Sequence, residues 1–216
     1  MNSIPNTPDE ALLDRIADAL VNEGYIICDQ AIDSALTLAL LQRIQQLDEL
    51  AFQRAGVGRE QDQQLNAQIR RDQIRWLDTH DAREAAYLSW MDQLRNGLNR
   101  RLFMGLFDYE CHFAHYAPGA FYKRHLDAFR GQTNRILTTV FYLNTDWQGD
   151  DGGELLLYPG QGDCVLERVA PQARRLVVFL SDRFPHEVLP ARTDRYSIAG
   201  WFRVNASIGN QIDPPR

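Results

Sequence analysis

The sequence predicts an α+β fold in which N-terminal helices support a sheet built by the C-terminal half. Two observations predict it. Apolar residues recur with helical spacing up to about residue 104, and short strand-like segments separated by turn signals follow from residue 109. Helices first and strands later are typical of folds with helices on one face of a sheet. No linker or repeat divides the chain, so we expect one domain over 1–216, with helical support at 7–104 and a strand core at 109–204.

The first helix is expected to begin near Thr7, which would be the N-cap residue. Pro8 suits the first helical position, and Glu10 would close a capping box. Gly24 ends the helix, and residues 25–28 predict a short strand.

A second helix is expected after Asp33 or Ser34, either of which could be its N-cap residue. Residues 53–70 are rich in Gln, Arg and Gly and predict a surface loop, which could be either an active-site lid or a simple connection. Residues 74–77 alternate like a strand, and Asp81 predicts the start of a third helix.

The second half predicts many short strands, which is typical of a sandwich or a barrel. Glycine-rich turn signals at 117–119, 149–153 and 159–160 separate them. The expected strands are 109–117, 121–125, 135–143, 154–158, 163–169, 174–180, 185–189 and 195–204.

Composition narrows the class of protein. A net charge of −6 argues against a nucleic-acid partner, because phosphate binding needs a basic surface. No apolar run is long enough to span a membrane, so no membrane association is expected. The three cysteines form no paired motif, and a reducing cytoplasm is therefore the expected location.

His125 and Asp127 form an HxD motif, and His186 lies far downstream. Residues two apart on a strand share a face, so His125 and Asp127 can chelate one ion if His186 arrives from another strand. Two imidazoles and one carboxylate are typical of non-haem Fe(II) oxygenases. Zinc binds the same donors, so a zinc hydrolase is an alternative. Arg195, nine residues after His186, favours the oxygenase, because its guanidinium suits the far carboxylate of 2-oxoglutarate.

Nine segments also carry a family resemblance, which extends from about residue 12 to residue 204. They are 69–76, 116–119, 121–127, 141–144, 146–147, 152–155, 180–183, 185–188 and 195–198, followed by Trp201. These segments resemble the prolyl 4-hydroxylase branch of the 2-oxoglutarate oxygenases, in particular the hypoxia-inducible-factor prolyl hydroxylases and their bacterial homologues. The resemblance implies a double-stranded β-helix (jelly roll), with its core at 109–204 and N-terminal supporting helices.

The resemblance also implies cofactors and roles for matching residues. His125, Asp127 and His186 would hold Fe(II), with 2-oxoglutarate and O₂ as co-substrates and ascorbate as a supporting reductant. Arg195 would pair with the distant carboxylate of 2-oxoglutarate. The other implied contacts are a hydrogen bond from Tyr142 to that carboxylate, Tyr116 beside the co-substrate, apolar walls from Val140, Leu155 and Trp201, and Tyr122 and Arg124 at the substrate entrance.

The expected partner is a protein that carries a target proline, which would be hydroxylated with release of succinate and CO₂. Departures from the family pattern leave the substrate open, so one alternative is the same chemistry on a free amino acid, small metabolite or alkylated base. A second alternative, from another class, is a non-catalytic jelly-roll binding module. His112 stands where a pocket methionine is found in the family, and it shares strand parity with Tyr116. Asp72 could pair with an arginine to anchor the 53–70 loop, or form an ordinary surface ion pair.

Overall fold

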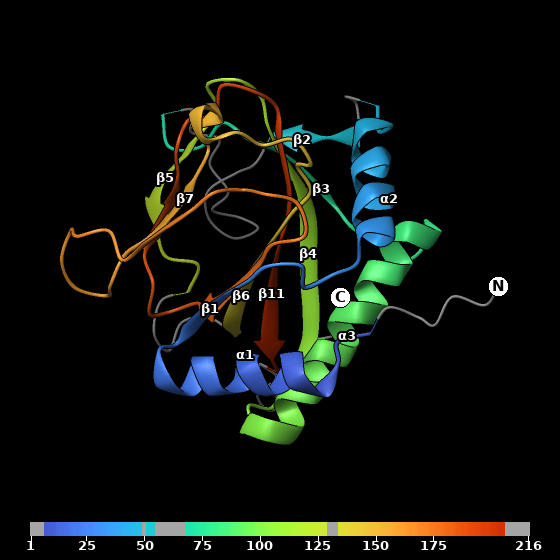
Figure 1. Ribbon diagram of the computed structural model, residues 1–216, viewed down its shortest axis with the longest axis vertical. Coiled ribbons are helices and arrows are strands. Elements are labelled where there is room, and N and C mark those ends of the chain that lie inside the picture. Colours follow the sequence, from blue (N-terminus) through green and yellow to red (C-terminus); the bar gives the residue numbers. More distant parts are fainter. Residues whose placement is uncertain (1–6, 49–50, 55–67, 129–133, 206–216) are drawn as a thin grey trace, which may run out of the picture.

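A computed structural model describes residues 7–48, 51–54, 68–128 and 134–205 (Figure 1). Two antiparallel sheets face each other, and three helices lie on the outer side of the larger sheet. The helices are α1 (Glu10–Asn22), α2 (Ser34–Gln45) and α3 (Ala82–Leu102). The strands are β1 (Tyr25–Cys28), β2 (Gln53–Arg54), β3 (Gln73–Trp76), β4 (Leu106–Tyr116), β5 (Tyr122–His125), β6 (Arg135–Tyr142), β7 (Leu155–Leu157), β8 (Glu167–Val169), β9 (Leu176–Leu180), β10 (His186–Val188) and β11 (Arg195–Val204), with a 3-10 turn η3 (Gly149–Asp151).

The seven-stranded sheet has the order β1-β9-β6-β11-β4-β3-β2, and the four-stranded sheet has the order β5-β10-β7-β8. Alternation along the strands gives the large sheet two apolar faces. On β4, Phe113 packs toward the helices, whereas Ala114 and Tyr116 face the small sheet. The inner core thus lies between the two sheets, and the outer core lies under α1, α2 and α3. The predicted α+β class is confirmed.

All three helices begin at an aspartate cap, which satisfies backbone N–H groups that the first turn leaves free. Asp33 accepts a hydrogen bond from the Leu36 amide at 2.7 Å, and Asp81 caps α3 as predicted. The expected start of α1 at Thr7 is wrong by two residues. Asp9 is the N-cap residue, because its carboxylate reaches the Leu12 amide at 2.7 Å.

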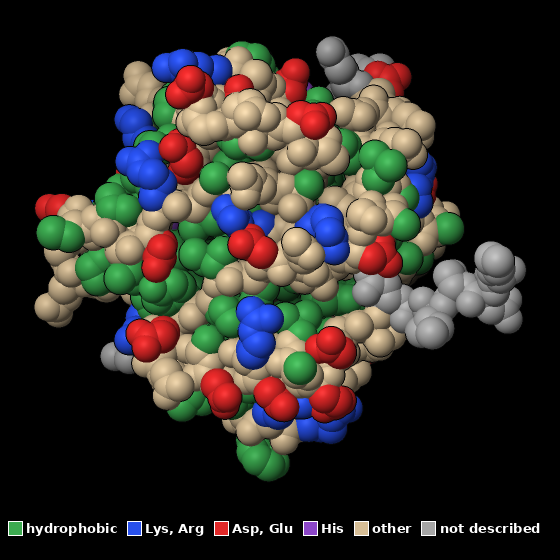
Figure 2. Space-filling model, in the orientation of Figure 1, with side chains coloured by type: hydrophobic (Ala, Val, Ile, Leu, Met, Phe, Trp, Pro, Cys, Tyr) green, Lys and Arg blue, Asp and Glu red, His purple; other side chains and the backbone are tan. Residues whose placement is uncertain are grey.

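The loop expected at 53–70 is also revised at its start. Gln53–Arg54 form strand β2, which pairs with β3. Most of that loop, at 55–67, lies outside the described residues. Among the helices that are described, none has the length and apolar composition required to cross a membrane. On the face drawn in Figure 2, acidic and basic side chains are interspersed and do not gather by sign.

Candidate metal centre and co-substrate pocket

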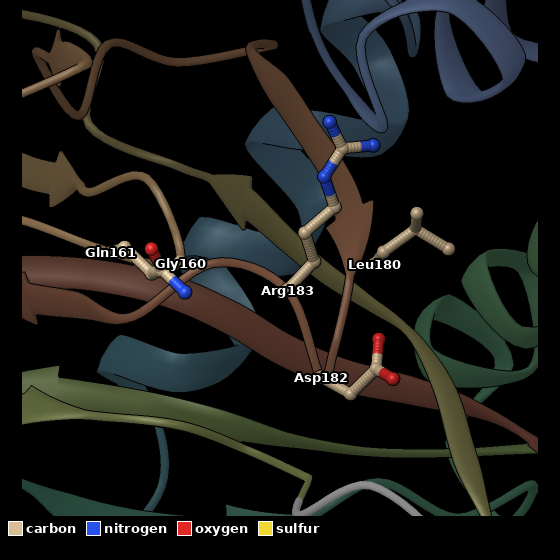
Figure 3. A pocket seen from close by; sticks show the side chains of 5 residues that line it. All are labelled: Gly160, Gln161, Leu180, Asp182 and Arg183. Carbon is tan, nitrogen blue, oxygen red and sulfur yellow. The ribbon is translucent and has the colours of Figure 1, made fainter.

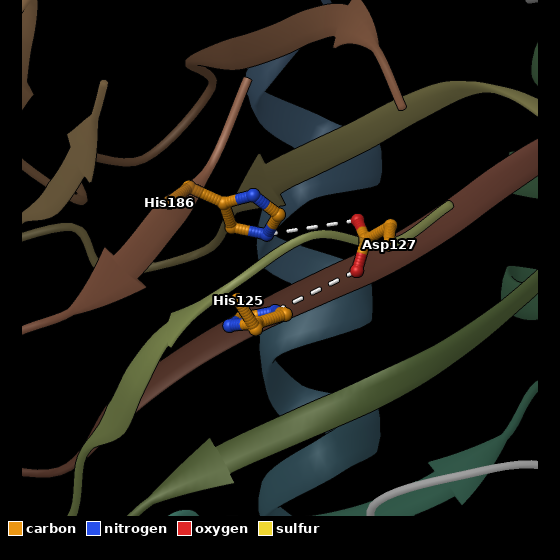
Figure 4. Close-up of side chains that lie close together, drawn as sticks. All are labelled: His125, Asp127 and His186. Carbon is orange, nitrogen blue, oxygen red and sulfur yellow. Dashed lines mark ion pairs between the residues drawn. The ribbon is translucent and has the colours of Figure 1, made fainter. Parts of the chain in front are cut away.

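His125, Asp127 and His186 converge at one end of the small sheet (Figure 4). His125 ends β5 and His186 begins β10, and antiparallel pairing places these two residues opposite each other. The Nε2 atoms of His125 and His186 lie 3.5 and 3.6 Å from separate carboxylate oxygens of Asp127. One donor atom from each residue falls within a 4.8 Å cluster, so the three side chains can hold a single ion.

Both imidazoles are held in the tautomer that a metal ligand requires. His125 Nδ1 lies 2.8 Å from the carbonyl of Lys123, and His186 Nδ1 lies 3.1 Å from the carbonyl of Phe184. An Nδ1–H that donates to a carbonyl leaves the lone pair of Nε2 free for a metal. Burial, followed by the neighbouring His125, lowers the pKa of His186 to about 4, so this imidazole is neutral at physiological pH.

Asp127 lies just beyond the end of β5, at a bend of the chain, so the strand alternation used to place it on the same face as His125 does not apply to it. Its Oδ2 accepts a hydrogen bond from Thr138 at 2.8 Å, and Thr138 Oγ1 lies 2.9 Å from the Ser181 hydroxyl. Thr138 has only one hydroxyl proton, so Ser181 donates to Thr138. Burial alone would raise the pKa of Asp127, but the neighbouring His186 and His125 hold it well below its ordinary value. The carboxylate is therefore charged and fixed in orientation.

We predict that Thr138→Val weakens metal binding about tenfold, because loss of a partner that orients a ligand typically has this effect. Thr139→Val is the matched control. Thr139 also has a buried hydroxyl on β6, but it bonds Tyr109 at 2.8 Å, on the helix side of the sheet. Titration of the metal-free protein with Co(II) measures both affinities. Equal affinities of the two variants would contradict the role of Thr138.

A second constellation surrounds Arg195, the first residue of β11, which is only 1% exposed. Its Nε donates to the carbonyl of Gly153 at 2.8 Å, and Nη1 donates weakly to Ser197 at 3.3 Å. The remaining Nη2 and the hydroxyl of Tyr142 are buried without a partner. The rings of Tyr116 and Tyr142 lie 4.8 and 5.1 Å from the guanidinium carbon. A buried cation and phenol with free donors fit a carboxylate, which can accept from both.

Gly153 is required for this arrangement. Its φ is +64°, a conformation that favours glycine, and a Cβ there would lie 3.1 Å from Arg195 Cδ. The glycine therefore lets its own carbonyl approach the guanidinium and fix it. This functional position was not predicted, although the Gly152-Gly153 pair within the 149–153 turn was a local signal.

Of the other predicted site residues, Leu155, Val140 and Trp201 are buried, whereas Arg124 and Tyr122 on β5 are not. Leu155 and Val140 are buried in the core between the sheets. Trp201 is 7% exposed, its side chain helps to lower the pKa of Asp127, and the guanidinium carbon of Arg135 lies 3.7 Å from its ring centroid. Arg124, by contrast, is exposed and directed to Asp163 and over the Tyr158 ring. Tyr122 lies against His125, with ring centroids 3.5 Å apart.

His112 is buried on the inward face of β4, with its ring 5.2 Å from Trp76 and 5.5 Å from Trp201. Burial, followed by the charge of Arg70, lowers the pKa of His112 to about 4. In the unfolded chain, the pKa of His112 has its ordinary value of 6.5. Between pH 4 and pH 6.5, the unfolded state therefore binds more protons at His112 than the folded state does. Stability contributed by His112 is thus present above pH 6.5 and lost as pH falls toward 4.

We therefore predict that the metal-free protein loses stability between pH 7.5 and pH 5, and that His112→Gln reduces this loss by about 2 kcal/mol. His186 contributes in the same direction in both proteins, so the variant isolates His112. Urea unfolding at the two pH values measures the difference. An unchanged pH dependence in the variant would contradict the prediction.

A separate hollow of about 510 Å³ lies elsewhere on the surface, between the 160–161 turn and the 180–183 turn (Figure 3). Gly160, Gln161, Leu180, Asp182 and Arg183 line it, and none of the predicted site residues does. The chemistry is therefore assigned to the His-Asp-His cluster and the Arg195 pocket.

A jelly-roll-like pair of sheets, a His-Asp-His cluster and a buried arginine with an unpartnered Nη2 define a non-haem iron oxygenase with a carboxylate co-substrate. The sequence profile described as the 2OG-Fe(II) oxygenase superfamily matches residues 111–203. A crystal structure of a Pseudomonas putida prolyl-4-hydroxylase is 42% identical, with a TM-score of 0.80, covering 90% of this chain and all of that chain.

Two further relatives match over most of their length. A Trichoplax adhaerens prolyl hydroxylase, solved in complex with a peptide of the hypoxia-inducible-factor oxygen degradation domain, is 31% identical, with a TM-score of 0.78 and 90% coverage of both chains. Human prolyl hydroxylase EGLN3 is 29% identical over 210 residues, which are 90% of this chain and 84% of that protein. The chain belongs to the prolyl 4-hydroxylase branch of the 2-oxoglutarate- and Fe(II)-dependent oxygenases. The predicted family, its jelly-roll fold, and its need for Fe(II), 2-oxoglutarate and O₂ are confirmed.

Proposed function

We propose that this chain hydroxylates a prolyl residue in a protein substrate. The observation that carries the proposal is the buried, unpartnered pair of Arg195 Nη2 and Tyr142 OH beside the convergent His-Asp-His cluster. The choice of a prolyl target is supported by likeness over nearly the whole chain to a bacterial prolyl-4-hydroxylase and to a prolyl hydroxylase with a bound protein peptide.

In this proposal, His125, Asp127 and His186 hold the metal through two imidazole nitrogens and one carboxylate. When bound, Fe(II) and 2-oxoglutarate together supply the activation of O₂ that substrate hydroxylation requires, with succinate and CO₂ as the other products. Arg195 and Tyr142 hold the distant carboxylate of 2-oxoglutarate, so the reacting end is delivered in one orientation. Burial and the charge of Arg195 act oppositely on the pKa of Tyr142, and burial prevails, raising it. The phenol therefore keeps its proton to donate.

The remaining predicted residues shape the pocket. Leu155 and Trp201 would exclude water from the co-substrate, and Tyr116 would lie beside it. Tyr122 lies next to a metal ligand and so belongs at the substrate entrance. Arg124, already engaged by Asp163, would reach a substrate only after leaving that partner. We also propose that 1–216 acts as one domain, with helical support at 7–104 and a jelly-roll core at 109–204.

Two proposals concern the surroundings of the reaction. Ascorbate would act as a supporting reductant that returns the metal to its ferrous state. A cytoplasmic location is supported by three free cysteines, Cys28, Cys111 and Cys164, of which the last is exposed.

The test is a proteome-wide search for prolyl residues that gain one oxygen atom in cells with the gene and not in cells without it. Reintroduction of the Asp127→Ala chain is the control and should restore no modification. Candidate peptides are then incubated with purified protein, Fe(II) and 2-oxoglutarate, and succinate is counted against hydroxyproline. Modification confined to another residue type, to a free metabolite or to an alkylated base would contradict the prolyl assignment.

A further inference from the structure

The segment at 69–76 connects the two sheets at the end where the metal cluster lies. Its second half is β3, which pairs with β4 in the large sheet. Its first half pairs with β5 in the small sheet: the Arg71 amide donates to the Phe121 carbonyl at 3.0 Å, and the Lys123 amide donates to the Ile69 carbonyl at 2.9 Å. The segment is therefore fixed to the strand that ends in His125.

A buried ion pair holds the corner of this segment. Arg70 Nε and Nη2 lie 2.5 and 2.8 Å from the two carboxylate oxygens of Asp72. The Asp72 side chain is fully buried and that of Arg70 is 11% exposed, so of the two alternatives for Asp72 the ordinary surface pair is wrong. A bidentate guanidinium pair shielded from water has one favoured geometry, and this fixes the position of the Arg70 side chain.

Arg70 in turn lies against Tyr122, with its guanidinium carbon 4.5 Å from the ring centroid. Tyr122 stacks on His125 at 3.5 Å between centroids, with the planes inclined by 16°. An irregular register allows this stack. His125 pairs with His186 and Tyr122 with Val188, so three steps on β5 oppose two on β10. This bulge brings Tyr122 and His125 to the same face of the strand.

We propose that Arg70 is a positioning residue for the metal ligand His125 and acts through the ring of Tyr122. The inference rests on the proposed function, because it assumes that His125 binds the metal. The hydrogen bond to Lys123 fixes one edge of the imidazole, and the stacked phenol ring restricts rotation about that bond. Arg70, anchored by Asp72, restricts the phenol ring. The 69–76 segment, which pairs with both sheets, thus sets the direction of the Nε2 lone pair of His125.

The experiment measures Co(II) affinity of the purified full chain, together with the His125 ring signal in the metal-free protein by NMR. Arg70→Ala and Tyr122→Leu should each weaken Co(II) binding about tenfold, as expected for loss of a ligand-orienting partner. The double variant should be no weaker than the worse single variant, because both act on one path. In each case the His125 ring proton should lose the upfield shift produced by the stacked phenol.

Three controls separate positioning from general damage. Tyr122→Phe keeps the stacked ring and should retain Co(II) affinity within twofold. Arg71→Ala removes a neighbouring arginine that is exposed and lies over Phe121, and it should also stay within twofold. Arg70→Met with Asp72→Leu removes both charges together, so that no carboxylate is left buried alone if Arg70→Ala fails to fold. This pair should show the same tenfold loss.

The outcomes are distinct. A native chain that binds no Co(II) at the cluster overturns both the proposed function and this inference. Suppose instead that the native chain binds Co(II), and that either Arg70→Ala or the Arg70→Met, Asp72→Leu pair folds cooperatively with unchanged Co(II) affinity. That result overturns only the positioning role. Weakened binding in those variants, with Tyr122→Phe and Arg71→Ala unaffected, supports it.

Discussion

Replacement of Asp127 by alanine is expected to abolish succinate formation and to remove tight metal binding. The two histidines then retain no carboxylate between them, although its oxygens lie 3.5 and 3.6 Å from their Nε2 atoms in the native chain. Loss of an outer partner of a ligand alone reduces activity roughly 10- to 100-fold, and loss of the ligand itself should exceed this. Turnover is measured as succinate released, and metal binding by Co(II) titration.

The matched control is Asp14→Ala. Asp14 is an exposed carboxylate on α1 that pairs with Arg101, and its loss should leave both measurements within twofold of native. Asp127→Asn adds a second comparison, because it keeps the side-chain volume but removes the charge. A native rate of succinate formation by the Asp127→Ala chain would contradict the assignment of the metal site.

Local patterns were enough to predict the elements that bear this site. Helical and strand periodicities are local properties, so all three described helices and every described strand from β4 to β11 overlap an expected segment, although β4 begins at Leu106 and β8 at Glu167 and not at 109 and 163. The start of α1 was missed because Thr7 and Asp9 are both good caps, and only the contact of Asp9 with the Leu12 amide decides between them. HxD is likewise local, whereas the approach of His186 depends on pairing between β5 and β10.

Features that depend on register or burial could not be predicted. The bulge that stacks Tyr122 on His125 depends on how β5 pairs with β10, so the sequence of β5 alone does not predict it. Asp72 follows Arg70 by two residues in a charged stretch, and its burial arises only because the segment bridges two sheets. Thr138 and Ser181 gave a weak signal as hydroxyl residues beside apolar strand positions, but their contact with Asp127 is tertiary.

Arg195→Lys is expected to raise the apparent KM for 2-oxoglutarate about 10- to 100-fold while kcat at saturation changes much less. Lysine keeps the positive charge but lacks the planar guanidinium group. In the native chain, the Nε of this group donates to the Gly153 carbonyl, and its Nη2 is left to bind a carboxylate. Loss of one hydrogen bond between charged partners amounts to about 1.5–3 kcal/mol, which corresponds to this change in affinity. If the substitution weakens binding of 2-oxoglutarate equally in the ground state and in the transition state, KM rises and kcat is unchanged.

Arg203→Lys is the matched control for this prediction, since Arg203 is also buried on β11 but is paired with Asp108. That variant should leave the KM for 2-oxoglutarate within twofold of native. Tyr142→Phe should raise the KM by less than Arg195→Lys, because it removes a neutral donor and keeps the cation. A fall in kcat with unchanged KM in Arg195→Lys would mean that the guanidinium does not hold the co-substrate. The unpartnered Nη2 would then require another anionic ligand, because a buried cation is not left without one.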